Sequence, residues 1–232
     1  MSDFKKNMGG KAYNKALELV APYYHPLLQK LSEKLAECLK DNSNPRVIDL
    51  GCGTGVSTGY IVSALPKSAI LAVDVWEDQL EAVPEDLLFS LQINWRVEDM
   101  AATLSMLPDG SLDAAVNGYA IHNLAPQERQ KIYSLVAQKL KKGGLFVNTD
   151  KIAIDDEAAH QKMLEERIQE YKKLGPMGYP REAQEWMEHY RHDETIRMTE
   201  AEVEEALNKL GLSPVYFGER IGLYVLCWAV KG

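Results

Sequence analysis

The 232-residue sequence predicts an α/β domain built around a mostly parallel sheet. Apolar segments alternate with helical segments along the chain, which is typical of βαβ units with right-handed crossovers. The strand-like segments lack the polar alternation of a half-exposed strand, so we expect helices on both faces of the sheet. A loop with glycine at every second position follows the first strand. The expected strands cover residues 47–50, 69–73, 92–97, 112–116 and 145–149.

The first half of the chain carries clear helical signals between these strands. Residues 11–24 and 26–39 repeat apolar side chains at helical spacing and predict two N-terminal helices. The next helix is expected over residues 57–65, directly after the glycine loop. Residues 77–90 are also helical in character, but Pro84 must break or kink that helix.

The second half begins with the clearest helix, and the alternation of strands and helices then stops. Residues 126–140 are amphipathic, and Pro126 stands in the first turn, where its missing N–H is tolerated. Gly143 and Gly144 are expected to end this helix before the fifth strand. Residues 155–191 contain no strand signal and carry two amphipathic helical segments instead. We predict that this insertion after the fifth strand forms a mobile helical lid.

The C-terminal segment returns to the regular pattern. Thr199 and Glu202 form a capping-box sequence that starts a helix running to about Leu210. Residues 215–217 and 223–230 can then close the sheet as an antiparallel hairpin. One domain is expected, made of N-terminal helices (1–44), a core (45–151), a helical insertion (152–198) and a C-terminal helix with a hairpin (199–232).

Composition and charge exclude several classes of partner. The net charge of −8 counts against a protein that binds the phosphate backbone of DNA or tRNA, because that role needs a basic face. The three cysteines, Cys38, Cys52 and Cys227, are too scattered for a disulfide framework or a zinc site, and we expect no metal. The sequence has no membrane-spanning apolar run and no signal-peptide pattern, so a cytoplasmic protein is expected.

The glycine loop is the most informative motif. Residues 47–55 read Val-Ile-Asp-Leu-Gly-Cys-Gly-Thr-Gly, and the glycines let the backbone turn sharply and approach a ligand closely. A helix that begins after the loop would point its N-terminal N–H groups at that ligand. A dinucleotide-binding loop needs glycine where Val56 stands, and a phosphate-binding Walker loop needs a Gly-Lys-Ser/Thr sequence that is absent.

The remaining pattern, Asp-x-Gly-x-Gly-x-Gly over residues 49–55, resembles the first motif of class I S-adenosylmethionine-dependent methyltransferases. Later motifs match in order and spacing, and the resemblance covers residues 45–151. It implies a doubly wound, seven-stranded sheet of order 3-2-1-4-5-7-6. It also implies S-adenosylmethionine as cofactor, S-adenosylhomocysteine as product, and direct displacement of the sulfonium methyl by a small-molecule nucleophile.

The resemblance gives each motif a role at the cofactor. Asp49 would lie near the amino end of the methionyl group, although it could instead cap N–H groups of its own loop. Asp74, at the end of the second strand, would accept hydrogen bonds from ribose hydroxyls. Asp99 would accept from the adenine amino group while Met100 packs on the ring, or it could simply begin a helix. The expected cofactor-binding residues are Asp49, Gly51, Cys52, Gly53, Thr54, Asp74, Val75, Asp99, Met100, Asn117 and Gly118.

The acceptor site is expected after the fourth strand. Residues 112–124 resemble the family's fourth motif, except that Asn123 replaces a second histidine. We expect His122 and Tyr119 to be catalytic, with His122 as the general base, because imidazole has an unperturbed pKa of about 6.5. A hydrogen-bonded structural role for His122 stays open. The expected substrate-binding residues are Tyr13, Tyr23, Asn123, Lys151 and Trp186.

Two other functions remain compatible with the sequence. One is a tRNA-modifying methyltransferase, against which the acidic balance counts. The other is a protein that binds S-adenosylmethionine without transferring its methyl group. The acceptor, the choice among O-, N-, S- and C-methylation, and the choice between monomer and homodimer stay open.

Overall fold

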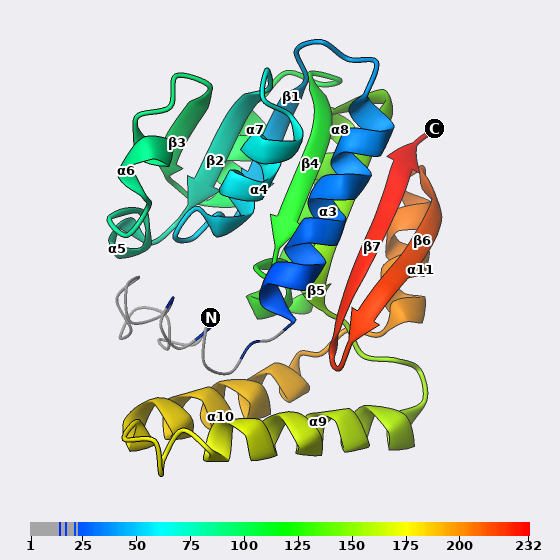
Figure 1. Cartoon of the computed structure of the whole chain (residues 1–232). Helices are drawn as coiled ribbons and strands as arrows, with labels where there is room; N and C mark the ends of the chain where they lie inside the picture. Colours follow the sequence, from blue (N-terminus) through cyan, green and yellow to red (C-terminus); the bar gives the residue numbers. More distant parts are fainter. Residues whose placement is uncertain (1–13, 15–16, 18–20, 22) are drawn as a thin grey trace.

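The structure is a computed structural model, which describes Asn14, Leu17, Ala21 and residues 23–232. Its centre is a seven-stranded sheet of order β3-β2-β1-β4-β5-β7-β6, as the sequence resemblance implied. Strands β1 to β5 are parallel, and β7 runs antiparallel between β5 and β6. The strands are β1 (Arg46–Leu50), β2 (Ala69–Asp74), β3 (Ile93–Val97), β4 (Leu112–Gly118), β5 (Leu140–Lys151), β6 (Leu212–Ile221) and β7 (Tyr224–Lys231) (Figure 1).

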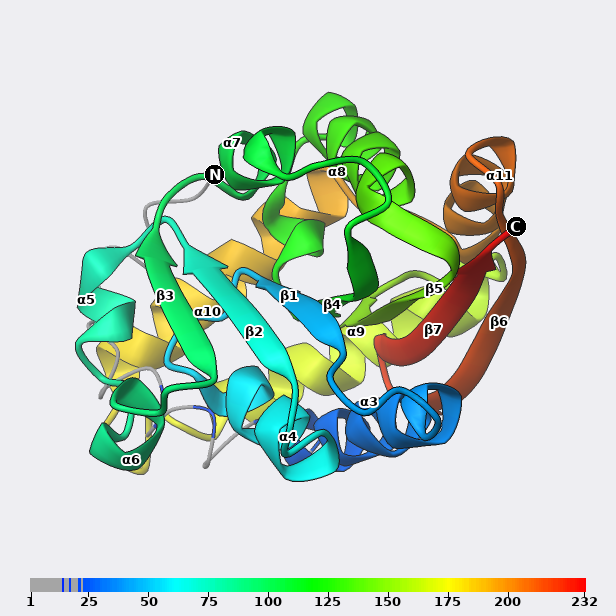
Figure 2. The same ribbon diagram turned by 90° about the horizontal axis from the view of Figure 1, so that it is seen from above.

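Helices cover both faces of the sheet and one of its ends. Helices α3 and α4 lie on one face, and α7, α8 and α11 lie on the other (Figure 2). Helices α9 and α10 lie across the end where the parallel strands terminate (Figure 1). The helices are α3 (Tyr24–Leu39), α4 (Val56–Ala64), α5 (Glu77–Leu80), α6 (Glu85–Leu88), α7 (Met100–Met106), α8 (Pro126–Lys139), α9 (Glu157–Lys172), α10 (Pro180–Thr195) and α11 (Glu200–Lys209), with a 3-10 turn η1 (Ile121–Asn123).

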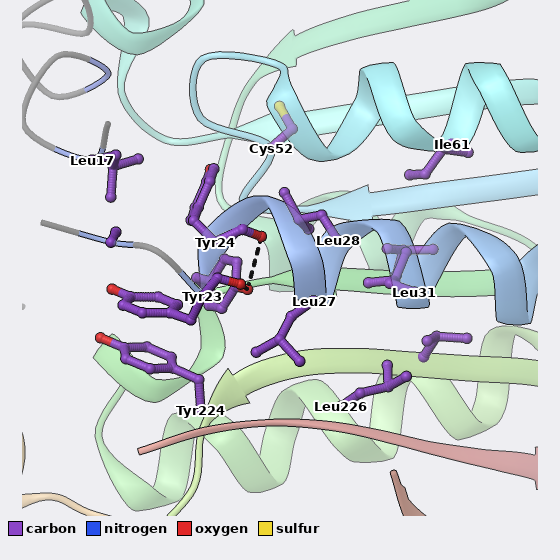
Figure 3. Close-up of a cluster of buried hydrophobic side chains, with 14 of the residues drawn as sticks. Leu17, Tyr23, Tyr24, Leu27, Leu28, Leu31, Cys52, Ile61, Tyr224 and Leu226 are labelled. Atoms are coloured by element: carbon purple, nitrogen blue, oxygen red, sulfur yellow. Dashed lines mark hydrogen bonds between the residues drawn. The ribbon is translucent and has the colours of Figure 1, made fainter. Parts of the chain in front are cut away.

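Helix α3 shows how an amphipathic sequence builds one of the two cores. Leu27, Leu28 and Leu31 are fully buried, and all three belong to one shared apolar cluster (Figure 3). Each buried leucine side chain stabilises the folded state by about 1.5–3 kcal/mol. The same helix places Tyr23 and Tyr24 at its N-terminal end, beside the carboxyl ends of the strands.

Most expected elements are present, and one expectation, the helix end at Gly143–Gly144, is wrong. Pro84 separates two short helices, as predicted, and the insertion forms helices α9 and α10. Helix α7 begins after Asp99, which is the alternative that the sequence left open for this residue; its seven residues are too few to show a helical period. The pair Gly143–Gly144 does not end α8, since Leu140 already turns into an extended conformation and pairs with Leu112. The glycines therefore lie inside β5.

The predicted helix over residues 11–24 lies mostly outside the described residues. Among the helices that the structure describes, none is long and apolar enough to cross a membrane.

Candidate functional site

The glycine loop brings the end of β1 against the segment that follows β4. Gly51, Gly53 and Gly55 have φ angles of 70°, 53° and 80°, a region that favours glycine. A Cβ added to Gly51 would lie 2.3 Å from the Cβ of Ala120, so only glycine fits. The N–H groups of Gly51 and Cys52 donate to the carbonyl of Val73 at 2.8 and 3.0 Å, which ties the loop to β2.

A cavity opens beside this loop at the carboxyl ends of β1 and β2, and we call it the strand-end cavity. It contains about 640 Å³ of empty space. Five of the expected cofactor residues meet there, and Asn123, which was expected at the acceptor, lies there too. Its lining residues are Gly51, Val73, Asp74, Val75, Trp76, Glu98, Asp99, Met100, Ala120, Asn123 and Leu124.

Two carboxylates at this cavity also hold the local backbone. Asp74 accepts from the N–H of Gly53 at 2.8 Å through Oδ2 and from the N–H of Trp76 at 2.9 Å through Oδ1. Asp99 is the N-cap of α7, where Oδ1 accepts from the N–H of Ala102 at 2.9 Å. A carboxylate oxygen can accept more than one hydrogen bond. Both side chains therefore keep acceptor capacity toward a ligand.

Asp49 is completely buried, and only one of its two carboxylate oxygens accepts hydrogen bonds. The hydroxyls of Ser57 and Thr58 donate to its Oδ2 at 2.8 and 2.7 Å, whereas Oδ1 has no partner among the described residues. It does not cap its own loop, which was the alternative considered from the sequence. Burial raises the pKa of Asp49 to about 6, despite the two hydroxyl donors. A cationic group that reached Oδ1 would stabilise the charged form.

The other six expected cofactor residues do not line the strand-end cavity; they are Asp49, Cys52, Gly53, Thr54, Asn117 and Gly118. Cys52 is buried, and burial raises the pKa of its thiol, so it is not an activated nucleophile. The Thr54 hydroxyl donates to Asn14 Oδ1 at 2.7 Å. Gly118 packs on Ser57, because a Cβ there would lie 3.0 Å from the Ser57 Cβ.

The side chain of Asn117 holds the turn that follows β4. Its Nδ2 donates to Asp150 Oδ2 at 3.0 Å, and its Oδ1 accepts from the N–H groups of Ala120 and Ile121 at 3.2 and 3.1 Å. Asn117 thereby fixes the path of the segment that carries Tyr119 and His122.

A second hollow, which we call the aromatic pocket, lies under the insertion. It is a narrow hollow that brings together four expected residues, Tyr23, Tyr119, His122 and Trp186. Tyr13, also expected there, lies outside the described residues. The lining residues are Leu17, Tyr23, Tyr24, Tyr119, His122, Trp186, His189 and Tyr224.

Stacked tyrosines form the walls of the aromatic pocket. Tyr23 stacks on Tyr224 with 3.7 Å between ring centroids, and the two rings lie side by side in Figure 3. Tyr119, with a φ of 64°, stacks on Tyr24 at 4.8 Å and donates its hydroxyl to the Tyr24 carbonyl at 3.2 Å. Burial raises the pKa of Tyr119 well above its usual 10, which favours the protonated hydroxyl.

His122 is held by a carboxylate that the sequence did not pair with it. Its Nδ1 bonds to Asp150 Oδ1, and its backbone N–H donates to Asp150 Oδ2 at 3.0 Å. Asp150 is itself completely buried at the end of β5. The Nε2 atom of His122 faces the insertion, 4.0 Å from Asp193 Oδ2. An imidazole anchored through Nδ1 has the orientation that a general base needs.

A buried charge network continues from His122 into the insertion. Lys151, expected to bind substrate, lies 3.0 Å from Asp193 Oδ2 and 3.9 Å from Glu194 Oε1, and it does not line the aromatic pocket. His189 Nε2 lies 3.4 Å from Asp193 Oδ2. Burial tends to raise the pKa of Asp193, but Lys151 and the two histidines hold it below its usual value.

Sequence reasoning missed Asp193 as a member of this site. The available signal was the i,i+4 spacing of His189 and Asp193, which puts both side chains on one face of α10. Among the described residues, His122, His189 and Asp193 are the only group whose potential metal-ligand atoms lie within 4.8 Å of one another. The ammonium of Lys151 lies 3.0 Å from the same Asp193 Oδ2 and offsets its negative charge.

Comparisons with known proteins agree with this architecture. Residues 47–144 match a family described as a methyltransferase domain. A carboxy-S-adenosyl-L-methionine synthase of Shewanella loihica is 25% identical over 154 residues, covering 66% of this chain and 62% of that protein. A synthase of the same name from Campylobacter fetus is 27% identical over 62% of this chain and 59% of its own length. The chain thus spans about three fifths of these curated relatives.

Solved structures show the same fold. An O-methyltransferase family protein of Burkholderia thailandensis has a TM-score of 0.65 at 14% identity, covering 95% of this chain and 59% of that one. The 1,6-didemethyltoxoflavin-N1-methyltransferase of the same organism, with bound S-adenosylhomocysteine, has a TM-score of 0.63 at 17% identity, covering 99% and 85%. Residues 47–144 are thus similar to a methyltransferase domain, and the strand order and these structures show that the chain has the doubly wound, seven-stranded fold of S-adenosylmethionine-dependent methyltransferases.

Proposed function

We propose that this protein is a methyltransferase that moves the sulfonium methyl of S-adenosylmethionine to a nucleophile on a small molecule. One observation carries the proposal: the strand-end cavity and the aromatic pocket meet at a single short segment. Ala120 lines the first, whereas Tyr119 and His122 line the second. A cofactor in one hollow and an acceptor in the other would face each other across this segment.

The strand-end cavity suits S-adenosylmethionine group by group. The Asp74 carboxylate would accept hydrogen bonds from the ribose hydroxyls, and Asp99 with Met100 would hold the adenine. The α-ammonium group would pair with Asp49, whose Oδ1 is buried and unpartnered among the described residues. The close approach of Gly51 to Ala120 would bring the methionyl chain to the edge of the aromatic pocket.

Methyl transfer needs a nucleophile aligned with the methyl carbon and the sulfur, with water excluded. Holding the two reactants in that geometry is the main contribution an enzyme makes to such a displacement. The tyrosine walls would exclude water, and the insertion, whose helix α10 contributes Trp186 and His189 to the pocket, would act as a lid. His122, oriented by Asp150, would take the proton that the acceptor loses.

The first test is calorimetry with S-adenosylhomocysteine, where we expect one site per chain. The second is incubation of the protein with methyl-labelled S-adenosylmethionine and a cell extract, followed by fractionation. We expect label in the small-molecule fraction. Label in RNA would support a tRNA-modifying enzyme instead, and binding without any labelled product would support a non-catalytic binding protein. Mass spectrometry of the cofactor pool tests for carboxylated cofactor, the product named in the curated relatives.

A further inference from the structure

One buried arginine, Arg129, binds backbone carbonyls from two distant parts of the chain. Its Nε donates to the carbonyl of Leu124 at 2.8 Å, and its Nη2 donates to the carbonyl of His122 at 3.4 Å. The same Nη2 also donates to the carbonyl of Ile196, the residue that follows helix α10. The Arg129 side chain is only 4% exposed. One guanidinium therefore joins the segment after β4 to the end of the insertion.

The position of Arg129 is unfavourable for its own helix and favourable for its partners. Arg129 is the fourth residue of α8, so its charge lies near the positive end of that helix dipole. Its partners lie at the opposite ends of helical turns, since Leu124 is the C-cap residue of η1 and Ile196 that of α10. Carbonyls at such ends have no partner within their own helix, and the dipole there favours a cation.

The charge of this guanidinium also links the same two segments. Burial lowers the pKa of Arg129, whereas the negative charges of Asp150 and Asp193 raise it. A guanidinium has an ordinary pKa above about 12, so the side chain stays charged. Asp150 anchors His122, and Asp193 lies on α10. The electrostatic partners of Arg129 thus belong to the segments whose carbonyls it binds.

We infer that Arg129 is a positioning residue of the proposed methyl transfer, which holds helix α10 in register with the segment that carries His122. Asp150 binds the ring and the N–H of His122, and Arg129 binds its carbonyl, so both sides of the residue are held. Helix α10 contributes Trp186 and His189 to the aromatic pocket. The role of His122 in the reaction rests on the proposed function, whereas the coupling of the two segments does not.

The first test is hydrogen exchange in the ligand-free protein. In Arg129→Ala, exchange should become about tenfold or more faster in residues 117–124 and in residues 180–196, since each segment loses a hydrogen bond to a charged donor. Lys131→Ala, an exposed position on the same helix, should leave both segments unchanged. If only one segment responds, or neither does, Arg129 does not couple them.

A second variant serves if Arg129→Ala does not fold. Arg129→Lys keeps the positive charge, but one ammonium nitrogen cannot occupy the positions of both Nε and Nη2. Exchange should again become faster in both segments, by about threefold or more. Unchanged exchange in Arg129→Lys would refute the coupling, because the charge alone would then be sufficient.

Chemical rescue separates the hydrogen bonds of Arg129 from its packing. Arg129 lines a groove of about 460 Å³ between α8 and α11, through which a small ion can reach the position that alanine leaves empty. Guanidinium chloride below its denaturing concentration should restore slow exchange in both segments of Arg129→Ala. Ammonium chloride at the same concentration should not, because it lacks the planar fork of donors. If guanidinium restores neither segment, the substitution acts through lost packing and the positioning role is refuted.

Turnover and binding measurements distinguish this role from the proposed function. With methyl-labelled S-adenosylmethionine, Arg129→Ala should transfer label about tenfold or more slowly, while its affinity for S-adenosylhomocysteine stays within about threefold of the wild type. An equal loss of affinity would mean that Arg129 acts through the cofactor site, which contradicts the inferred role. Failure of the wild-type protein to transfer label would refute the proposed function, and the exchange and rescue results would still decide whether Arg129 couples the two segments.

Discussion

Gly51→Ala tests whether the close approach between the glycine loop and Ala120 builds the cofactor site. The added Cβ would lie 2.3 Å from the Ala120 Cβ, and Gly51 has a φ of 70°. Gly110 is a matched control, because its φ is 59° but a Cβ there would meet nothing within 4 Å. The two substitutions therefore share the backbone strain and differ in the clash.

The expected magnitudes follow from these two terms. An alanine held at positive φ costs about 1–2 kcal/mol, which both variants experience. Overpacking adds about 1–3 kcal/mol at Gly51 alone. We expect Gly110→Ala to lose about 1–2 kcal/mol of unfolding free energy and Gly51→Ala to lose about 2–5 kcal/mol. Ala120 must also move, and it lies two residues before His122 in the segment shared by the two pockets.

Urea denaturation measures the stability difference, and calorimetry measures binding of S-adenosylhomocysteine. Gly51→Ala should bind the product cofactor at least about tenfold more weakly than the wild type, whereas Gly110→Ala should bind it normally. If Gly51→Ala is no less stable than Gly110→Ala and keeps its affinity, the contact with Ala120 does not constrain the loop.

Four further predictions test other parts of the site. Asp74→Ala should weaken S-adenosylhomocysteine binding by about 1–3 kcal/mol, because ribose hydroxyls and the Gly53 N–H lose their acceptor; calorimetry with unchanged affinity would remove Asp74 from the site. His122→Asn should keep that affinity but lower kcat about 10²–10⁴-fold, and a loss below about tenfold would mean that alignment alone carries the chemistry. Burial raises the pKa of Asp49 from 3.8 to about 6, so its charge destabilises the ligand-free protein as pH rises through that interval. Asp49→Asn should therefore gain up to about 3 kcal/mol of unfolding free energy above pH 6, yet it should bind S-adenosylhomocysteine more weakly. If the difference in unfolding free energy between variant and wild type is the same at pH 4 and pH 7, the burial effect is contradicted. Hydrogen exchange in residues 155–191 should slow when the product cofactor binds, and identical exchange in the free and bound protein would argue against a lid.

The sequence determined the layered architecture because its signals are local. A run of apolar residues without alternation is buried on both faces wherever it lies, which identifies β1 and β2 directly. Glycines at positive φ and an acid at the end of β2 likewise encode the cofactor loop within a short stretch of chain. The order of the strands needed the family resemblance, since periodicity does not say which strands are neighbours.

Only the tertiary structure decided the polar chemistry of the acceptor site. Asp150 meets His122 from 28 residues away, and Asp193 meets Lys151 from 42 residues away, across the junction of β5 and α10. Helical spacing showed which face of α10 was apolar, but not that His189 and Asp193 on that face would be buried. A residue's periodicity fixes its side of an element, whereas its partners depend on how whole elements pack against one another. The proximity of His122 and Asp193 therefore became visible only in the folded chain.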